Sequence, residues 1–188
     1  MKKLTLSLLF SLLSIIARAF TGIVEIGDLK YNIVTKGKTA EVIGLASGKL
    51  PTDIVIPGTI EYEGVICNVS SIGQRAFLGC TELTNVSIPN SVTSIGEAAF
   101  AGCSSLTSVA IPQNVKEIDV CTFQNCSNLI SVNIPNGVTT IGNSAFNRCS
   151  NLTSITIPNS VTLIDGHAFS FCSKLSSISI PNSVTAIL

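Results

Sequence analysis

The sequence predicts a β-rich solenoid, a stack of short coils that share one continuous core. Three observations predict it. One pattern recurs every 23 residues, without insertion, from residue 72 to residue 188. Within each copy, apolar and polar residues alternate up to a proline, as in a short half-buried strand. Trp is absent while Ser, Thr and Asn are abundant, a composition typical of secreted β proteins.

The first residues have the pattern of a signal peptide. Lys2 and Lys3 precede an apolar run from Leu4 to Ile16, and Ala17–Ala19 supplies a small-x-small cleavage site. The alternative, a membrane anchor, requires about 20 apolar residues, more than this run contains. We predict a signal peptide over residues 1–19, a mature chain from Phe20, no membrane span after cleavage, and a secreted or cell-surface location.

Net charge excludes one class of partner. Without Lys2, Lys3 and Arg18, 8 of the 11 basic residues remain against 11 acidic ones, so the mature chain carries a charge of −3. Nucleic-acid binding needs a clustered surplus of Lys and Arg, because the phosphates must be neutralised. We therefore expect no nucleic-acid partner.

Two segments precede the regular array. Residues 20–53 are predicted to form an N-terminal β cap, with a hairpin of two alternating strands around the turn Lys36–Lys38. Residues 54–79 form an irregular first repeat, since the step from Pro57 to Ile72 is nine residues longer than that from Pro89 to Ile95. Such a cap covers the apolar face of the first coil.

Residues 80–188 form the regular array, with four full units of 23 residues and one partial unit. In each unit a strand ends at the proline, because proline lacks an N–H, and a second extended piece follows. The segment around the periodic Phe is compact enough for one helical turn. Three of the columns are Phe77, Phe100, Phe123, Phe146 and Phe169; Cys80, Cys103, Cys126, Cys149 and Cys172; and Leu83, Leu106, Leu129, Leu152 and Leu175.

The repeat L-x-x-[VI]-x-I-P-x-x-V-x-x-I-[GD]-x-x-[AT]-F-x-x-C resembles that of the BspA-like, or Treponema-type, leucine-rich repeat surface proteins. The resemblance is close over residues 72–188 and loose over residues 54–71. It implies a right-handed leucine-rich-repeat coil of 23-residue units. It also implies a bacterial surface protein, without enzymatic activity, that attaches to host matrix, host cells or neighbouring bacteria.

Two outward columns flank the first strand of each unit and are our candidate ligand-binding residues. They form a stripe of small hydroxyls and amides, which suits an extended extracellular protein partner; the alternative is an inert face of a structural spacer or assembly module. Glycan sites usually present aromatic side chains to the sugar. Glycan binding is disfavoured here, because the candidates for such a platform, Tyr31 and Tyr62, both lie in the cap and not in the stripe. The columns are Asn85, Ser108, Ser131, Ser154 and Ser177, and Ser87, Ala110, Asn133, Thr156 and Ser179.

No cofactor, metal or catalytic site is expected. A column of identical cysteines offers no tetrahedral ligand set and cannot pair completely, so we predict buried free thiols. Cys121 lies outside that column and is predicted to be the most reactive thiol. Ser144 and His167 share its column, with Asp165 nearby, but this outer turn has no pocket to exclude water.

The last unit ends at Ile187 and Leu188 without a polar cap. We therefore expect the C-terminal coil to fray or to associate with a second copy.

Overall fold

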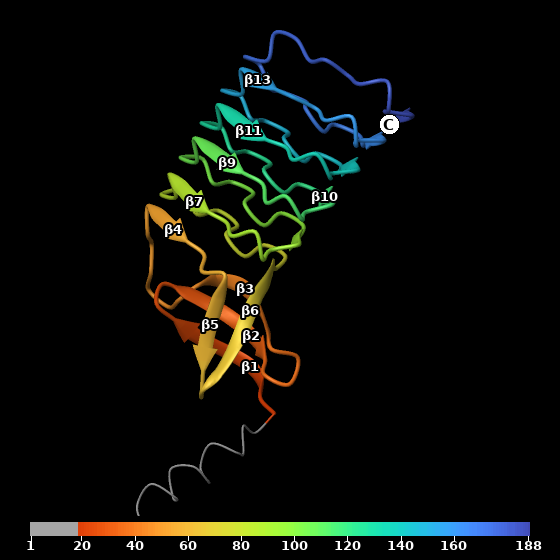
Figure 1. Cartoon of the computed structure of the whole chain (residues 1–188). Coiled ribbons are helices and arrows are strands. Elements are labelled where there is room, and N and C mark those ends of the chain that lie inside the picture. The colour runs from red at the N-terminus through yellow and green to blue at the C-terminus, as the bar shows by residue number, and fades with distance from the viewer. Residues whose placement is uncertain (1–18) are drawn as a thin grey trace, which may run out of the picture.

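The computed structural model describes residues 19–188, which form a twisted sheet followed by a stack of coils (Figure 1). The described residues contain strands and turns and no helix. The predicted signal peptide lies, apart from Ala19, outside the described residues.

The cap contains the predicted hairpin. Strands β2 (Leu29–Val34) and β3 (Thr39–Leu45) pair antiparallel, and alternate residues of β2 are buried beneath the first coil. A strand that we did not predict, β1 (Thr21–Ile26), pairs with β2 through a turn at Gly27. The sequence signal for β1 is weak because none of its residues is fully buried.

The nine extra residues of the first repeat form a second hairpin. Strands β5 (Thr59–Tyr62) and β6 (Val65–Ile72) pair antiparallel around Glu63 and Gly64, both with positive φ. Strand β6 also pairs in parallel with β3 and with β8 (Ser94–Ile95). The insertion therefore joins the cap sheet to the first coils without a break.

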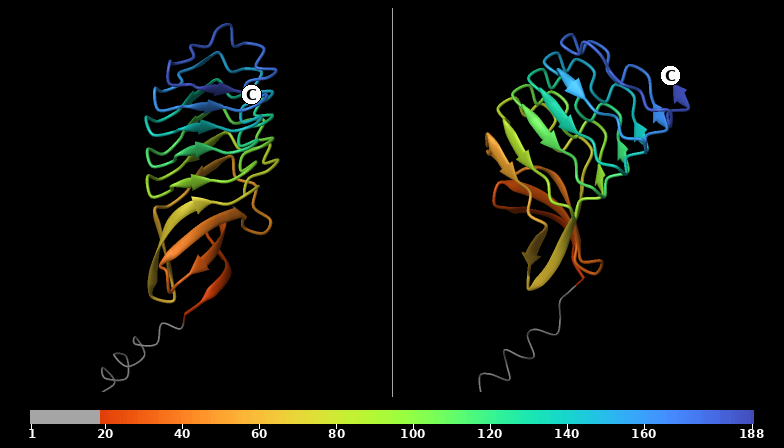
Figure 2. Two further views of the ribbon diagram at one scale, coloured as in Figure 1. Left: turned by 90° about the vertical axis from the view of Figure 1, so that its right-hand side faces the viewer. Right: turned by 45° about the horizontal axis from the view of Figure 1, so that its top comes forward.

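The coils stack through two sets of short parallel strands, which lie on opposite sides of the stack in the right view of Figure 2. Paired residues are 23 apart in the chain, as in Ser108 with Ser131 and Glu117 with Thr140. This arrangement confirms the β-rich solenoid. The first set is β4 (Asp53–Val55), β7 (Asn85–Ser87), β9 (Ser108–Ala110), β11 (Ser131–Asn133) and β13 (Ser154–Ile155). The second set is β8, β10 (Glu117–Ile118), β12 (Thr140–Ile141), β14 (Leu163–Ile164) and β15 (Ala186–Ile187).

A ladder of phenylalanines runs along the core. Neighbouring rings from Phe77 to Phe169 have centroids 5.2–5.6 Å apart and planes within 17° of each other. The rings of Phe77, Phe100, Phe123 and Phe146 are fully buried, and Phe169 is half-buried. Each ring thus covers the next at the separation of stacked aromatic pairs.

The helical turn that we expected around each Phe is not formed. The Phe77 and Phe100 amides donate instead to the Ala99 and Thr122 carbonyls of the following coil, at 2.8 and 3.0 Å. An α-helix needs those amides for bonds to residues four positions earlier. Hydrogen bonds between coils therefore form in place of those within a helix. The chain turns through a residue with positive φ in every unit: Arg75, Ala98, Cys121, Ser144 and His167.

The cysteine column is buried and unoxidised, as predicted, except that Cys80 is half-buried. From Cys103 onwards each thiol donates to the carbonyl of the Phe 26 residues earlier, at 3.2 Å, as Cys126 does to Phe100. Burial raises the pKa of Cys103 and Cys149 to about 12. These thiols therefore stay protonated at neutral pH and act as donors within the core.

Candidate binding surface

The first set of strands carries seven of the ten predicted ligand-binding residues, and all ten are exposed. In β7, β9 and β11 a buried Val separates two outward side chains, which explains the two columns. Thr156, Ser177 and Ser179 continue the columns beyond the strand ends. We call these ten residues the polar stripe.

The polar side chains of the stripe make no hydrogen bond to any residue from 19 to 188. The threonines next to the stripe differ: the Thr84 and Thr153 hydroxyls donate to carbonyls of the preceding coil at 2.9 and 3.5 Å. Threonine hydroxyls beside the strands therefore join the coils to one another. The stripe keeps its hydrogen-bonding capacity for solvent or for a partner.

Two further residues continue the stripe into the cap. Asp53 and Val55 of β4 stand in register with Asn85 and Ser87 of β7, and Val55 is 75% exposed. Sequence reasoning missed them because the insertion hides the alignment of DIVIP with NVSIP. The stripe therefore begins with one carboxylate at its cap end.

An exposed aromatic ring lies beside the array, contrary to our expectation that the candidate platforms were Tyr31 and Tyr62. Phe171 is 70% exposed, and the Arg148 guanidinium lies 5.4 Å from its ring centroid. Together with Asn125, Ser127 and Ser150 the pair lines a shallow hollow. In the sequence, Phe171 occupies the repeat position that is glycine in Gly79 and Gly102, and this difference was the signal that could have identified the exposed ring.

Phe171 also has an unfavourable backbone, with φ of 60°. For residues other than glycine, this left-handed region raises the conformational free energy by about 1–2 kcal/mol. Phe171→Gly removes this strain and loses a cation–π contact worth about 0.5–1 kcal/mol. We expect a net gain of about 0.5–1 kcal/mol in unfolding free energy, measured with urea.

Gly102 in the same column is the matched control, with φ of 75°. Gly102→Ala should lower the unfolding free energy by about 1 kcal/mol. A loss of stability in both variants would show that the Phe171 backbone is not strained.

The column of Cys121, Ser144 and His167 is not organised for catalysis. His167 Nδ1 contacts the Ser170 hydroxyl at 3.3 Å, while Ser144 donates to Asn143 at 3.0 Å. The Asp165 carboxylate accepts from the Gly166 amide. The structure does not bring Ser144, His167 and Asp165 into one hydrogen-bonded chain.

The surroundings of Cys121 do not favour its thiolate, and its place as the most reactive thiol stays a prediction. Its side chain is half-buried, and burial together with the Glu97 carboxylate raises the pKa of the thiol. Reactive thiols need a lowered pKa, because the thiolate is the nucleophile. Among residues 19–188 no group of three or more His, Cys, Asp or Glu residues is placed to hold a metal ion.

Known proteins identify the repeat. A family model described as "BspA type Leucine rich repeat region" matches residues 70–188 in six copies. The chain belongs to the BspA-type leucine-rich repeat family. No curated protein matches its sequence.

Solved structures share the BspA-type fold of this chain. A leucine-rich repeat protein of Treponema pallidum is 28% identical, with a TM-score of 0.74 over 85% of this chain and 72% of that one. A protein of Eubacterium ventriosum is 30% identical, with a TM-score of 0.70 over 89% and 48%. A leucine-rich cell surface protein of Faecalibacterium prausnitzii is 29% identical, with a TM-score of 0.64 over 91% and 52%.

The BspA-type chain thus spans about half the length of the last two proteins. In the part of it that the structure describes, no helix has the length and apolar character needed to cross a bilayer.

Proposed function

We propose that this protein is exported and mediates adhesion at the bacterial surface, with the polar stripe binding an extracellular protein of the host matrix or of a neighbouring cell. The observation that carries the proposal is the exposed row of side chains whose donors and acceptors are unused within residues 19–188. Membership of the BspA-type family and the likeness to a cell surface protein support the location.

The stripe suits an extended partner for a geometric reason. Parallel strands place equivalent side chains about 4.8 Å apart on a rigid sheet. Small side chains such as Ser131 and Ser154 lose little rotamer entropy when a partner fixes them. The Arg148–Phe171 pair supplies an aromatic and a guanidinium group, the residue types that dominate binding energy in protein interfaces.

The proposal assigns no catalytic role. The groups that would be needed, Ser144 and His167, each hydrogen-bond to another residue. Binding requires only the exposed surface.

Adding charge to the stripe tests this function. Ser131 and Ser154 are paired on adjacent coils, so Ser131→Glu with Ser154→Glu places two carboxylates side by side. A partner that buries this surface must desolvate both charges, and we expect its affinity to fall at least about tenfold. Binding to a panel of immobilised matrix proteins and whole cells measures the change.

The matched control is Asn136→Glu with Asn159→Glu, which adds the same charge at exposed positions of adjacent coils outside the stripe. We expect this control to keep its affinity, and circular dichroism to show both variants folded. Equal loss in the two double variants would contradict a specific role for the stripe.

A structural spacer or assembly module remains our second candidate, favoured by the last coil. There Ile187 and Leu188 are 63% and 75% exposed, whereas equivalent Ile positions in earlier coils are buried. A further coil, from a continuation of the chain or from a second copy, would cover this surface. Sedimentation that depends on concentration, together with no binding by the unaltered protein, would favour this candidate over adhesion.

A further inference from the structure

The hollow beside Phe171 presents a cation that has no partner within the described chain. Its volume is about 450 Å³, and its lining includes Ser127 and Ser150. The Arg148 guanidinium lies over the Phe171 ring and forms no ion pair or hydrogen bond with any residue from 19 to 188. Its five N–H donors are therefore open to a ligand.

Arg75 provides a contrast. It is exposed like Arg148, but its guanidinium lies 3.7 Å from the Glu97 carboxylate of the next coil. The fold can therefore supply a carboxylate to an arginine on its surface. At Arg148 it does not, and the charge there is left for a ligand.

The sequence around the hollow also carries an excess of positive charge. Residues 120–188 contain two basic residues, Arg148 and Lys174, and a single acidic residue, Asp165. The Asp165 carboxylate accepts from the adjacent backbone amide. The Lys174 amide donates to the Ser150 carbonyl at 3.2 Å, which places a second cationic residue next to the hollow. This end of the solenoid attracts an anion, although the mature chain as a whole is negative.

The other groups of the hollow suit a carboxylate. Because the Phe171 ring restricts the guanidinium, the N–H edge of Arg148 is held ready to bond both oxygens of one carboxylate. The Asn125 amide and the Ser127 hydroxyl form no hydrogen bond with another described side chain or carbonyl, and they can donate to the same group. The Ser150 hydroxyl donates to the Ser127 carbonyl at 3.3 Å and joins two coils of the hollow.

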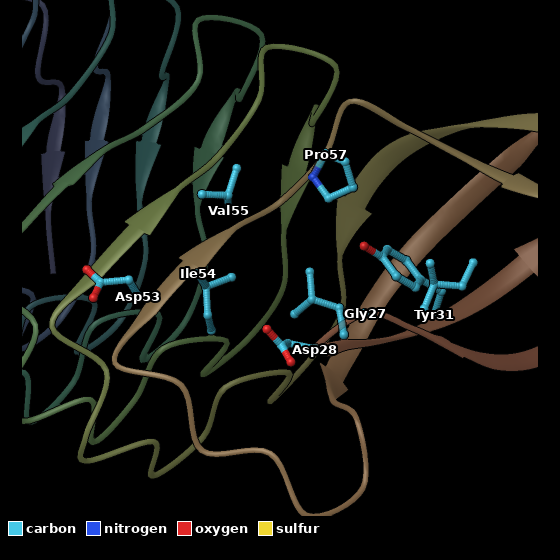
Figure 3. Close-up of a pocket in the computed structure, with 9 residues that line it drawn as sticks. Gly27, Asp28, Tyr31, Asp53, Ile54, Val55 and Pro57 are labelled. Carbon is cyan, nitrogen blue, oxygen red and sulfur yellow. The ribbon is translucent and has the colours of Figure 1, made fainter.

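The pocket between the cap and the solenoid has no comparable unpaired charge. Its volume is about 260 Å³, and its Asp28 pairs with Lys49 at 3.0 Å. Figure 3 shows the Asp53 carboxylate, on the exposed face of β4, directed away from Tyr31. The hollow beside Phe171 is therefore the stronger candidate for a charged ligand.

We propose that this hollow binds a carboxylate of the partner protein, on the side chain of a glutamate or an aspartate. The Arg148 guanidinium donates to the two carboxylate oxygens, and Lys174 adds a weaker attraction. The CH₂ groups of the acidic side chain lie against the Phe171 ring, which is 70% exposed.

The hollow lies close enough to the polar stripe for one partner to contact both. Ser127 comes four residues before Ser131 of the stripe, so the two are at most roughly 14 Å apart. The inference rests on the proposed function for the source of the carboxylate, whereas binding of the carboxylate group itself does not depend on the stripe.

The test uses the purified protein and two matched probes, Nα-acetyl-glutamate methylamide and Nα-acetyl-glutamine methylamide, followed by NMR. The glutamine probe has the same stem with a neutral amide in place of the carboxylate. We expect saturable shifts of the Phe171 ring and the Arg148 side chain with the glutamate probe only. Its dissociation constant should lie in the millimolar range, because the site is open to water.

Three variants identify the groups that bind. Arg148→Gln should weaken binding of the glutamate probe at least about tenfold, and Arg148→Lys, which keeps the charge without the planar fork, about threefold or more. Phe171→Gly should also weaken it about threefold, although we expect this variant to be more stable, so the loss cannot result from unfolding. Arg75→Gln removes an exposed arginine outside the hollow and is the control, which should bind as the unaltered protein does.

The proposal is overturned if the glutamate probe gives no saturable shift, if the glutamine probe binds equally well, or if Arg148→Gln binds as the unaltered protein does. Tighter binding of glucuronate than of the glutamate probe would overturn it in favour of an acidic glycan. Because the probes are small molecules, these outcomes are separate from those of the stripe variants. Carboxylate binding can fail while Ser131→Glu with Ser154→Glu still weakens adhesion, and the reverse.

Discussion

Phe123→Ala is expected to lower the free energy of unfolding by about 3–5 kcal/mol, the range for buried aromatic residues. Phe123 is fully buried, and its ring stacks on Phe100 and Phe146 with centroids 5.6 and 5.5 Å away. Deleting it removes both contacts and leaves a cavity in the middle of the ladder, where the coils cannot collapse without losing their backbone bonds. Urea unfolding followed by circular dichroism measures the loss.

Phe169→Ala is the matched control for this prediction. Phe169 belongs to the same column but is half-buried and stacks only on Phe146 among the described residues. We expect a smaller loss than for Phe123→Ala, because less apolar surface returns to water. Equal losses would show that ring burial does not determine stability in the ladder.

Gly142→Ala is expected to cost about 2–3 kcal/mol, at the upper end of the range for overpacking. A Cβ there would lie 2.9 Å from three backbone atoms of the preceding coil: the Ile118 oxygen, the Asp119 carbonyl carbon and the Val120 nitrogen. Backbone held in the stacked strands cannot move aside as a side chain can. The substitution therefore widens the spacing between two coils, and thermal and urea unfolding measure the effect.

Gly166→Ala separates this clash from a general effect of losing glycine. A Cβ at Gly166 has the side-chain Nδ2 of Asn143 as its nearest atom, at 3.0 Å, and this amide can rotate away. We expect a change below about 0.5 kcal/mol, as for ordinary surface substitutions. A loss at Gly166 as large as that at Gly142 would contradict the steric explanation.

The repeat made much of this structure predictable. A Phe recurs every 23 residues, together with an Ile and a Leu at fixed positions of each repeat. All of these side chains can be buried at once only in a single shared core, and the burial of Phe100 and Leu106 follows from it. The exposure of Ser131 and Asn133 follows from strand alternation around Val132. These predictions succeeded because identical coils in one register leave few alternatives.

The remaining features depend on contacts that periodicity does not encode. The turn before Phe100 has the composition of a helix, but the Thr122 carbonyl of the next coil takes its amide. The insertion displaced Asp53 from the apparent register, so its place beside Asn85 was missed. Phe171 lies two residues after the half-buried Phe169, and its departure from the column that begins with Gly79 and Gly102 was the one signal that its ring faces water.

The uniform bonding between coils has a genetic consequence. The Thr162 amide and hydroxyl both bond to the Thr139 carbonyl, and the Thr185 amide and hydroxyl bond in the same way to the Thr162 carbonyl. Since each coil offers the next coil the same attachments that it receives, recombination between the DNA segments that encode the repeats can lengthen or shorten the protein by whole coils. Lineages can thereby change how far this molecule extends while the fold of each remaining coil stays the same.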